Sequence, residues 1–158
     1  MADSAFFCTL THEGVLAVIG TDASTFLQGQ LTCNLNYLSE TRSSLGARCT
    51  QKGRMQSSFR ILLQPDGCLL AMARELVEPQ LADLKKYAVF SKSKLTDDSA
   101  NWVRFGLSGA DAVLAGLGLD GGWLVIFDRR PGLAPVEERL AHSVATSPGG
   151  RRITVIRA

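Results

Sequence analysis

The chain has 158 residues, of which 46% are hydrophobic and 20% are charged, and its formal net charge is +2. This composition is typical of a soluble globular protein and excludes disordered and collagen-like chains. Its apolar runs are far shorter than the roughly 20 residues of a membrane-spanning helix. The weak positive charge does not by itself indicate a nucleic-acid-binding domain. Because no secretory signal is found at the N-terminus, we expect a cytoplasmic location.

Two short strands and a helix are predicted first. Residues 6–10 and 15–19 have the apolar character of strands and are separated by a short turn. A helix is expected next, because Thr21 or Asp22 can cap its first backbone N–H groups and the apolar residues that follow have helical spacing. The segment 29–34 ends this helix.

Two β-hairpins and a second helix are predicted in the middle of the chain. The turns at 51–53 and 64–67 are rich in turn-forming residues. An amphipathic helix follows, with Pro79 at a first helical position and Lys85 and Lys86 near its C-terminus. The three strands of the hairpins are expected at 45–50, 54–63 and 68–72.

The last part of the chain is predicted to alternate strands and helices. We expect strands at 102–107, 123–127 and 153–156, and helices at 111–117 and 136–141. Strands that come in groups before helices favour an α+β fold, with antiparallel β-meanders and packed helices, over a doubly wound sheet. A sub-boundary within the chain is expected near 98–101.

Several common site motifs are weak or absent. Residues 116–121 spell GxGxxG, but a predicted helix enters this segment and a strand leaves it, which reverses the order that binds dinucleotides. The four cysteines contain no CxxC pair, so no metal site is expected, and Cys8 and Cys68 are interpreted as small buried residues. Neither His12 nor His142 lies near a hydrolase signature. For His12 an exposed turn and a ligand contact both stay open.

An unusual run of polar residues lies at 46–60. Strand alternation predicts that four polar side chains share one face: Arg54, Gln56, Ser58 and Arg60. Two interpretations are open. The face is either a solvated side of an antiparallel sheet, or a concave surface for an anionic or hydrogen-bonding ligand, with Lys52 and Arg54 projecting from the turn.

Four blocks of the sequence resemble the YgfZ folate-binding family, whose members are relatives of the glycine-cleavage T-protein, an aminomethyltransferase. The blocks are FLQGQLT at 26–32, KGRM at 52–55, EPQL at 78–81 and KKYAVFSK at 85–92. The resemblance implies a tetrahydrofolate-binding α+β fold, with residues 1–158 as the N-terminal portion of a longer protein. It also implies a role in iron–sulfur cluster maintenance and tRNA modification.

The chain departs from the T-protein where that enzyme carries acids. An Asp-Asp pair of the T-protein aligns with Ser57 and Ser58, and an Asn-Asp pair aligns with Cys33 and Asn34. A serine hydroxyl is uncharged at neutral pH and does not stabilise a developing cation as a carboxylate does. We therefore expect folate binding without aminomethyl transfer, and no catalytic residue. The Lys-Gly-Cys signature of the YgfZ family is also missing.

The resemblance implies a set of six folate-binding residues. Glu13, Ser58 and Leu62 align with folate contacts of the T-protein, although Glu13 lacks the stacking face of the Met or Trp found at its position in relatives. The other three would contact the anionic tail of the folate: Lys52, Arg54 and Arg60.

Two other functions stay open. A folate-dependent aminomethyltransferase-like or demethylase-like enzyme would use a different acid, Glu13 or Asp66. An interaction module would bind RNA or a protein through a basic tail, made of Arg129, Arg130, Arg151, Arg152 and Arg157. Iron–sulfur proteins are expected partners, direct contact with tRNA stays open, and no membrane is expected. A sheet that continues in longer relatives would expose an edge, so a dimer or a domain-swapped pair is also expected.

Overall fold

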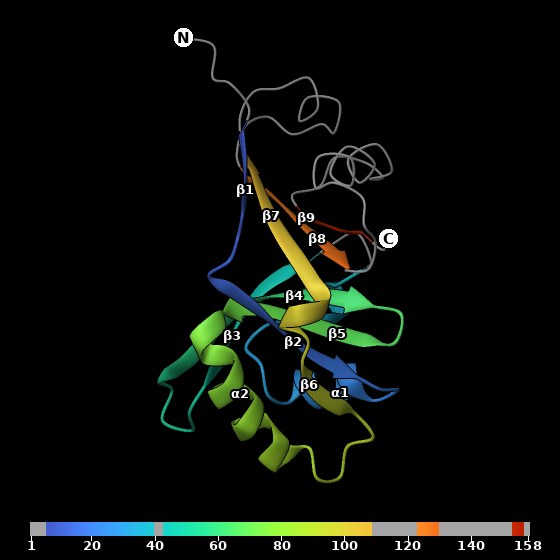
Figure 1. Cartoon of the computed structure of the whole chain (residues 1–158). Helices are drawn as coiled ribbons and strands as arrows, with labels where there is room; N and C mark the ends of the chain where they lie inside the picture. The colour runs from blue at the N-terminus through green and yellow to red at the C-terminus, as the bar shows by residue number, and fades with distance from the viewer. Residues whose placement is uncertain (1–5, 40–42, 109–122, 130–152, 157–158) are drawn as a thin grey trace. The chain divides into compact units, whose positions relative to one another are not determined.

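The computed structural model describes residues 6–39, 43–108, 123–129 and 153–156 (Figure 1). The chain divides into two compact units. One unit consists of Met1–Thr11 together with Ala100–Ala158, and the other consists of His12–Ser99. The second unit is therefore inserted in the sequence of the first.

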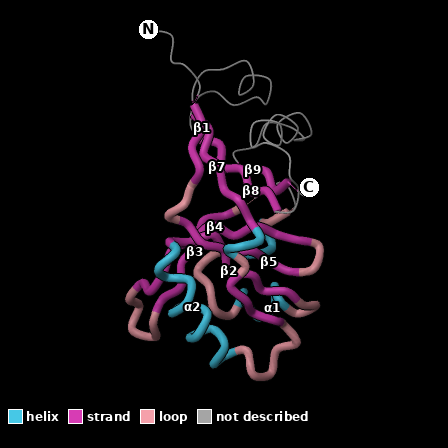
Figure 2. Tube along the Cα trace, viewed as in Figure 1, coloured by secondary structure: helices cyan, strands magenta, loops and turns pink. Residues whose placement is uncertain are grey.

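The unit His12–Ser99 is built on a five-stranded antiparallel sheet with the strand order β3-β4-β5-β2-β6 (Figure 2). Its strands are β2 (Glu13–Ile19), β3 (Ser44–Cys49), β4 (Met55–Gln64), β5 (Gly67–Ala73) and β6 (Lys94–Asp97). The β3–β4 and β4–β5 pairings confirm both predicted hairpins. Strand β6 was not predicted, because its four residues include only one buried apolar side chain, that of Leu95.

Glycine is required at both hairpin turns. Gly53 has a φ of 77° in the β3–β4 turn, a conformation that other residues rarely adopt. In the β4–β5 turn, a Cβ atom on Gly67 would lie 2.1 Å from the carbonyl oxygen of Val18 in the neighbouring strand. The two turns that the sequence predicted at 51–53 and 64–67 are thus fixed by backbone geometry.

Two helices cover one face of this sheet: α1 (Ala23–Gln28) and α2 (Arg74–Tyr87). The predicted start of the second helix at Pro79 was wrong. The helix begins at Arg74, whose backbone N–H donates to the carbonyl oxygen of His12 (2.9 Å), and Pro79 lies inside it. Because proline has no backbone N–H, Pro79 removes the hydrogen bond that this position would donate to the carbonyl oxygen of Glu75.

The helix α1 differs from its prediction at the cap. Asp22 occupies the N-cap position, but its side chain makes no capping hydrogen bond. Instead the carboxylate accepts hydrogen bonds from the backbone N–H of Lys92 (2.8 Å) and the hydroxyl of Ser93 (2.7 Å). These bonds lower the pKa of Asp22 and fasten the segment before β6 to the start of α1. A short 3-10 helix, Leu35–Tyr37, follows α1.

The main core lies between the sheet and the two helices. Alternate residues of β2, β4 and β5 point toward α1 and α2, as the period of two in a strand requires. Cys68, with 0% of its surface exposed, is one of them, which confirms its predicted burial. The core consists of Leu16, Val18, Ala23, Leu27, Leu35, Leu38, Phe59, Ile61, Cys68, Leu70, Met72, Val77, Leu84 and Leu95.

The other unit contains a four-stranded sheet with the order β1-β7-β8-β9. Its strands are β1 (Phe6–Thr9), β7 (Trp102–Ser108), β8 (Trp123–Arg129) and β9 (Ile153–Ile156), of which β9 is parallel to β8 and the others pair antiparallel. All four were predicted. The helices predicted at 111–117 and 136–141, the GxGxxG segment and His142 lie outside the described residues.

Antiparallel strands followed by packed helices in the unit His12–Ser99 confirm the predicted α+β class. None of the helices in the described ranges is both long and apolar enough to cross a membrane.

Candidate functional site

Four of the six predicted folate-binding residues share one face of the five-stranded sheet. In β4, Ser57, Phe59 and Ile61 point toward the helices, so Ser58, Arg60 and Leu62 point away from them. The register carries this face across the sheet, because Arg60 is opposite Ala71, Ala71 is opposite Val15, and Glu13 is two residues before Val15. We name it the second face: Glu13, Val15, Ala17, Ala47, Ser58, Arg60, Leu62, Leu69, Ala71 and Ala73.

The second face combines buried apolar residues with partly exposed polar ones. Leu62 is buried, with 3% of its surface exposed, whereas Ser58 is exposed and Arg60 is half-buried. Alanines occupy the positions between the polar side chains, since Ala73 is opposite Glu13 and Ala47 is opposite Ser58. The polar side chains therefore alternate with alanines, whereas the larger apolar residues of this face, Val15, Leu62 and Leu69, are buried.

Glu13 is half-buried, and its Oε2 atom is buried without a hydrogen-bond partner. Buried carboxylate oxygens in folded proteins are normally hydrogen-bonded, because removal from water without a compensating donor is costly. The second face thus presents an acceptor that lacks a donor among the described residues.

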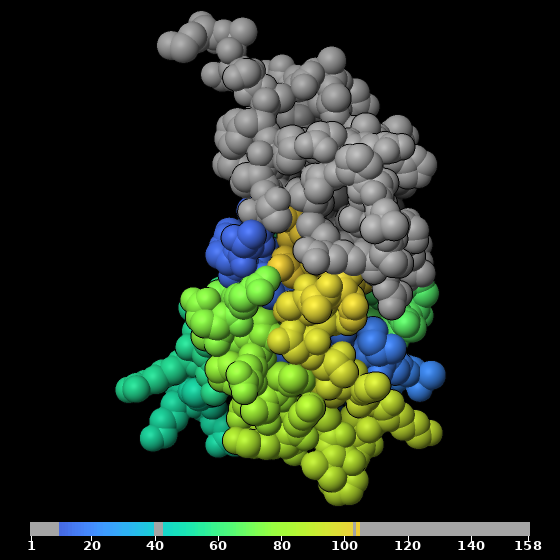
Figure 3. All heavy atoms as spheres, viewed as in Figure 1, coloured from blue at the N-terminus to red at the C-terminus, as the bar shows by residue number. Residues whose placement is uncertain are grey.

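Lys52 and Arg54 lie elsewhere. A register shift between Arg48 and Cys49 marks a β-bulge, at which Gln56 has no partner on β3. A bulge changes the direction of side chains, so Gln56 and Arg54 are not aligned with Ser58 as strict alternation predicted. Figure 3 shows the long side chains of the β3–β4 turn, in teal, projecting beside α2.

Lys52, Arg54 and Gln56 line a hollow of about 750 Å³ on the side of the sheet that α2 covers. We name it the Arg48 hollow. Its lining consists of Gly29, Gln30, Arg48, Cys49, Thr50, Gln51, Lys52, Arg54, Gln56, Asp83 and Tyr87. The six predicted residues are therefore divided between two opposite sides of the sheet.

Arg48 organises this hollow, although only 4% of its surface is exposed. Its guanidinium donates to the carboxylate of Asp83 and to the side-chain oxygen of Gln56 (3.0 Å). A longer contact of 3.4 Å joins it to the side-chain oxygen of Gln30, and its Cζ atom lies 5.2 Å from the centre of the Tyr87 ring. A buried charge is thus paired, as burial requires.

The Arg48–Asp83 pair joins β3 to α2. The hydrogen bond from Arg48 lowers the pKa of the Asp83 carboxyl, and Lys86, 3.5 Å away, acts in the same direction. Sequence reasoning missed this pair because the partners are 35 residues apart. The sequence carries no local signal for it, because strand alternation puts Arg48 on the face opposite the apolar residues Leu45 and Ala47, whereas in the structure Arg48 is buried and Leu45 is exposed.

The two serines that align with acids of the T-protein have different surroundings. Ser57 is buried and donates its hydroxyl hydrogen to the side-chain oxygen of Gln80 in α2. Ser58 belongs to the second face and is exposed. Of the two, only Ser58 is therefore placed to meet a ligand on that face.

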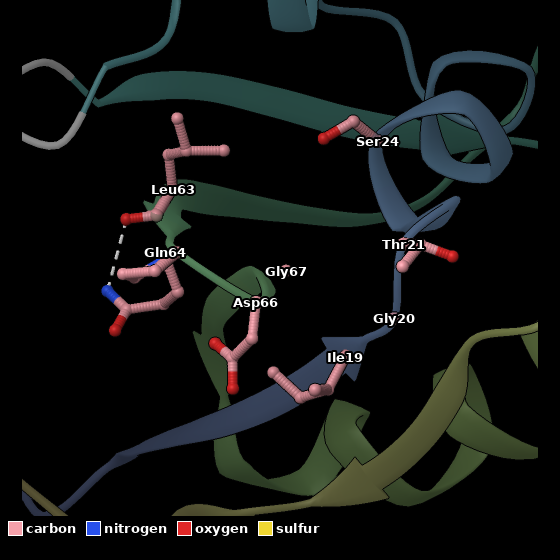
Figure 4. Close-up of a pocket in the computed structure, with 9 residues that line it drawn as sticks. Ile19, Gly20, Thr21, Ser24, Leu63, Gln64, Asp66 and Gly67 are labelled. Carbon is pink, nitrogen blue, oxygen red and sulfur yellow. Dashed lines mark hydrogen bonds between the residues drawn. The ribbon is translucent and has the colours of Figure 1, made fainter.

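A second hollow, of about 590 Å³, lies at the β4–β5 turn and the start of α1 (Figure 4). Its polar side chains include those of Thr21, Ser24 and Asp66, and the amide of Gln64 donates to its neighbour's carbonyl oxygen, that of Leu63 (3.1 Å). Asp66 is remote from Glu13, because the β2–β5 pairing runs from Glu13 at one end to Gly67 at the other. The two acids considered for an enzyme are not in one site.

The remaining candidate residues form no site in the described part of the chain. Among the described residues, no group of three or more His, Cys, Asp or Glu side chains is arranged to hold a metal ion. His12 has an exposed side chain in a turn. The side chain of Arg129 and the whole of Arg130, Arg151, Arg152 and Arg157 lie outside the described residues.

Comparison with known proteins shows which family this chain is similar to. No family model matches the chain. A "tRNA-modifying protein YgfZ" of Shigella boydii serotype 18 is 38% identical over 111 residues, which are 69% of this chain and 34% of that protein. One of Escherichia coli O157:H7 is 38% identical over 104 residues, 66% of this chain and 32% of that protein. This chain is YgfZ-like over about two thirds of its length. The match spans about a third of the length of these curated relatives.

A solved structure supports the fold of the YgfZ-like chain. The glycine cleavage system aminomethyltransferase T of Bartonella henselae superposes with a TM-score of 0.65, covering 98% of this chain and 48% of the enzyme, at 20% sequence identity. At that identity the likeness concerns the fold. The predicted T-protein-like fold and the predicted resemblance to YgfZ are both confirmed.

Proposed function

We propose that this YgfZ-like chain binds tetrahydrofolate on the second face without transferring a one-carbon group. In this proposal it serves in the cytoplasm as an accessory protein of tRNA modification and of iron–sulfur enzyme maintenance. The observation that carries the folate assignment is the buried Oε2 atom of Glu13, which lacks a donor. The relatives named as tRNA-modifying proteins support the part of this role that concerns tRNA modification.

The chemistry of Glu13 suits a pterin. The 2-amino group and the neighbouring ring N–H of a pterin donate side by side, and a carboxylate accepts two parallel hydrogen bonds of this kind. Ala73 is opposite Glu13 and Ala71 is two residues away, so the neighbours of the carboxylate on β5 are small side chains. Binding would supply the donor that the buried oxygen lacks.

The other polar residues of the second face would meet the rest of the ligand. Ser58 offers a hydroxyl and Arg60 a positive charge, whereas Leu62 is buried and would form part of the apolar floor. Because Ser58 is uncharged, this part of the face lacks a carboxylate to stabilise a cation that develops on the folate. Binding without turnover follows from this composition.

Isothermal titration of the chain with tetrahydrofolate under reducing conditions tests the proposal. We expect measurable binding, and a loss of affinity of roughly 10- to 150-fold in Glu13→Gln, because a charge-assisted hydrogen bond contributes about 1.5–3 kcal/mol. Glu75→Gln, at an exposed acid in the first turn of α2, is the matched control and should bind normally. Absence of binding to the unaltered chain would refute the folate assignment.

A folate enzyme is the second candidate, with either Glu13 or Asp66 as its acid. The two lie at opposite ends of the β2–β5 pairing, so only one of them could act in a given site, and on the second face Ser58 supplies no further carboxylate. Incubation with a methylamine donor and tetrahydrofolate should therefore yield neither formaldehyde nor methylene-folate. Formation of either product would favour the enzyme.

A further inference from the structure

The Arg48 hollow has no part in the proposed folate site, since it lies on the side of the sheet that α2 covers. We propose that it binds a nucleotide of single-stranded RNA. In this arrangement the base lies against Tyr87, and the phosphate lies against Lys52 and Arg54. The proposal assigns a direct RNA contact to the unit His12–Ser99, and it does not depend on folate binding.

The buried guanidinium of Arg48 is the first indication of a ligand. Its Nη atoms are occupied by Asp83, Gln56 and Gln30, but its Nε–H is buried without a hydrogen-bond partner. An unsatisfied buried donor costs about 1–3 kcal/mol, so such donors are normally paired. Because Arg48 lines the hollow, an oxygen of a bound molecule is the acceptor that would complete it.

The inner part of the hollow suits a base. Tyr87 is the last residue of α2, and 52% of its surface is exposed even though Arg48 lies over its ring. Exposed aromatic rings bind unpaired bases by stacking, with little dependence on sequence. The amides of Gln30 and Gln56 also line the hollow and carry both donors and acceptors for a base edge.

Asp83 gives the inner part a fixed acceptor. Its pKa is lowered by the hydrogen bond from Arg48, so the carboxylate is ionised at neutral pH and accepts hydrogen bonds only. An exocyclic amino group of a base is a suitable donor for such an acceptor. A phosphate would be repelled here, which directs the phosphate toward the turn.

The outer part of the hollow suits a phosphate. Lys52 and Arg54 are exposed on the β3–β4 turn, and the lining as a whole contains three cations, with Arg48, against the single carboxylate of Asp83. The volume of about 750 Å³ lies within the range of roughly 300–1,000 Å³ that small-molecule pockets occupy. Cation, exposed ring and amide groups together are the chemistry of a nucleotide site.

Fluorescence anisotropy of the whole 158-residue chain with a labelled single-stranded RNA 12-mer of mixed sequence tests this inference. We expect Lys52→Ala/Arg54→Ala to weaken binding and to reduce the slope of log affinity against log salt by about 0.7, the contribution of the single phosphate that the two cations contact together. Tyr87→Ala should lose roughly 5- to 150-fold in affinity, whereas Tyr87→Phe should keep it, because the ring is what stacks.

A charge-matched control separates the site from general attraction. Lys92→Ala/Lys94→Ala removes two exposed lysines that do not line the hollow, so its RNA affinity should stay close to that of the unaltered chain. Equal losses in the two double variants, or no loss in Tyr87→Ala, would overturn the proposal. Displacement of the RNA by tetrahydrofolate triglutamate would instead assign the hollow to folate. Thermal unfolding of each variant checks that it is folded.

Discussion

Strand β5 and the tip of the β3–β4 hairpin, residues 49–56, belong to one sheet but differ in almost every physical respect. β5 pairs with β4 and β2, and its residues are buried on both sides except for Ala73. The hairpin tip has no buried residue, and its cations line the Arg48 hollow. The centre of the sheet therefore contributes to the stability of the fold. The tip carries polar side chains that can meet a ligand, and it adds little to the core.

The largest predicted effect is on the free energy of unfolding, and one substitution in each region tests it. Leu70→Ala in β5 removes a side chain with 0% exposure and should lower the free energy of unfolding by about 2–5 kcal/mol through lost burial and a cavity. Met55→Ala in the hairpin tip, at a side chain that is 65% exposed, should change it by about 0.5 kcal/mol or less. Urea denaturation measures both. Similar losses would contradict the contrast.

The next effect concerns the pair that joins the hairpin to α2. Asp83→Asn leaves the buried Arg48 without its carboxylate, and we expect a loss of about 2 kcal/mol, since hydrogen bonds to charged groups contribute about 1.5–3 kcal/mol. Asp97→Asn, at an exposed acid in β6, is the control for removing a carboxylate and should show a smaller loss. Urea denaturation at pH 7 compares the two.

The effect of Asp83→Asn should also depend on pH. The folded pKa of Asp83 lies below its ordinary value of 3.8, so its contribution to stability is complete above that value and is lost as the pH falls through the folded pKa. The difference between Asp83→Asn and the unaltered chain should therefore be constant near neutral pH and shrink below about pH 4. A difference that grows in acid would show that the carboxylate does not carry the interaction.

The two hairpins and the fold class could be predicted from the sequence. The apolar run of β5 and the turn residues around Gly53 and Gly67 are local signals, and they gave both hairpins and the α+β class. The strand β6 was missed because its polar residues resemble a loop and only its pairing with β2 makes it a strand. Pro79 was a misleading signal, because α2 begins where the backbone N–H of Arg74 donates to the carbonyl oxygen of His12, 62 residues earlier in the chain.

The candidate sites were harder to predict than the fold. Alternation correctly placed Ser58 and Arg60 on one face of β4, but it also placed Arg54 and Gln56 there, because a bulge leaves no mark in the sequence. The partners of Arg48 come from α1, β4 and α2, or from positions next to them, and meet only in the folded chain. From the sequence alone we named Lys52 and Arg54, which line the hollow, but missed Arg48 and its partners.

The smallest effect uses two cysteines as reporters of the two regions. Cys68 in β5 is fully buried, and burial raises the pKa of its thiol, so it stays protonated and unreactive at neutral pH. Cys49, at the start of the hairpin tip, is exposed. We expect a thiol reagent to modify Cys49 at least about 100-fold faster than Cys68, which reacts only when the sheet opens. Peptide mapping by mass spectrometry follows each residue. Cys49→Ser should remove the corresponding modification and change the free energy of unfolding by about 0.5 kcal/mol or less. Rapid modification of Cys68 in the folded chain would contradict the prediction, because it would show that the centre of the sheet opens as readily as its edge.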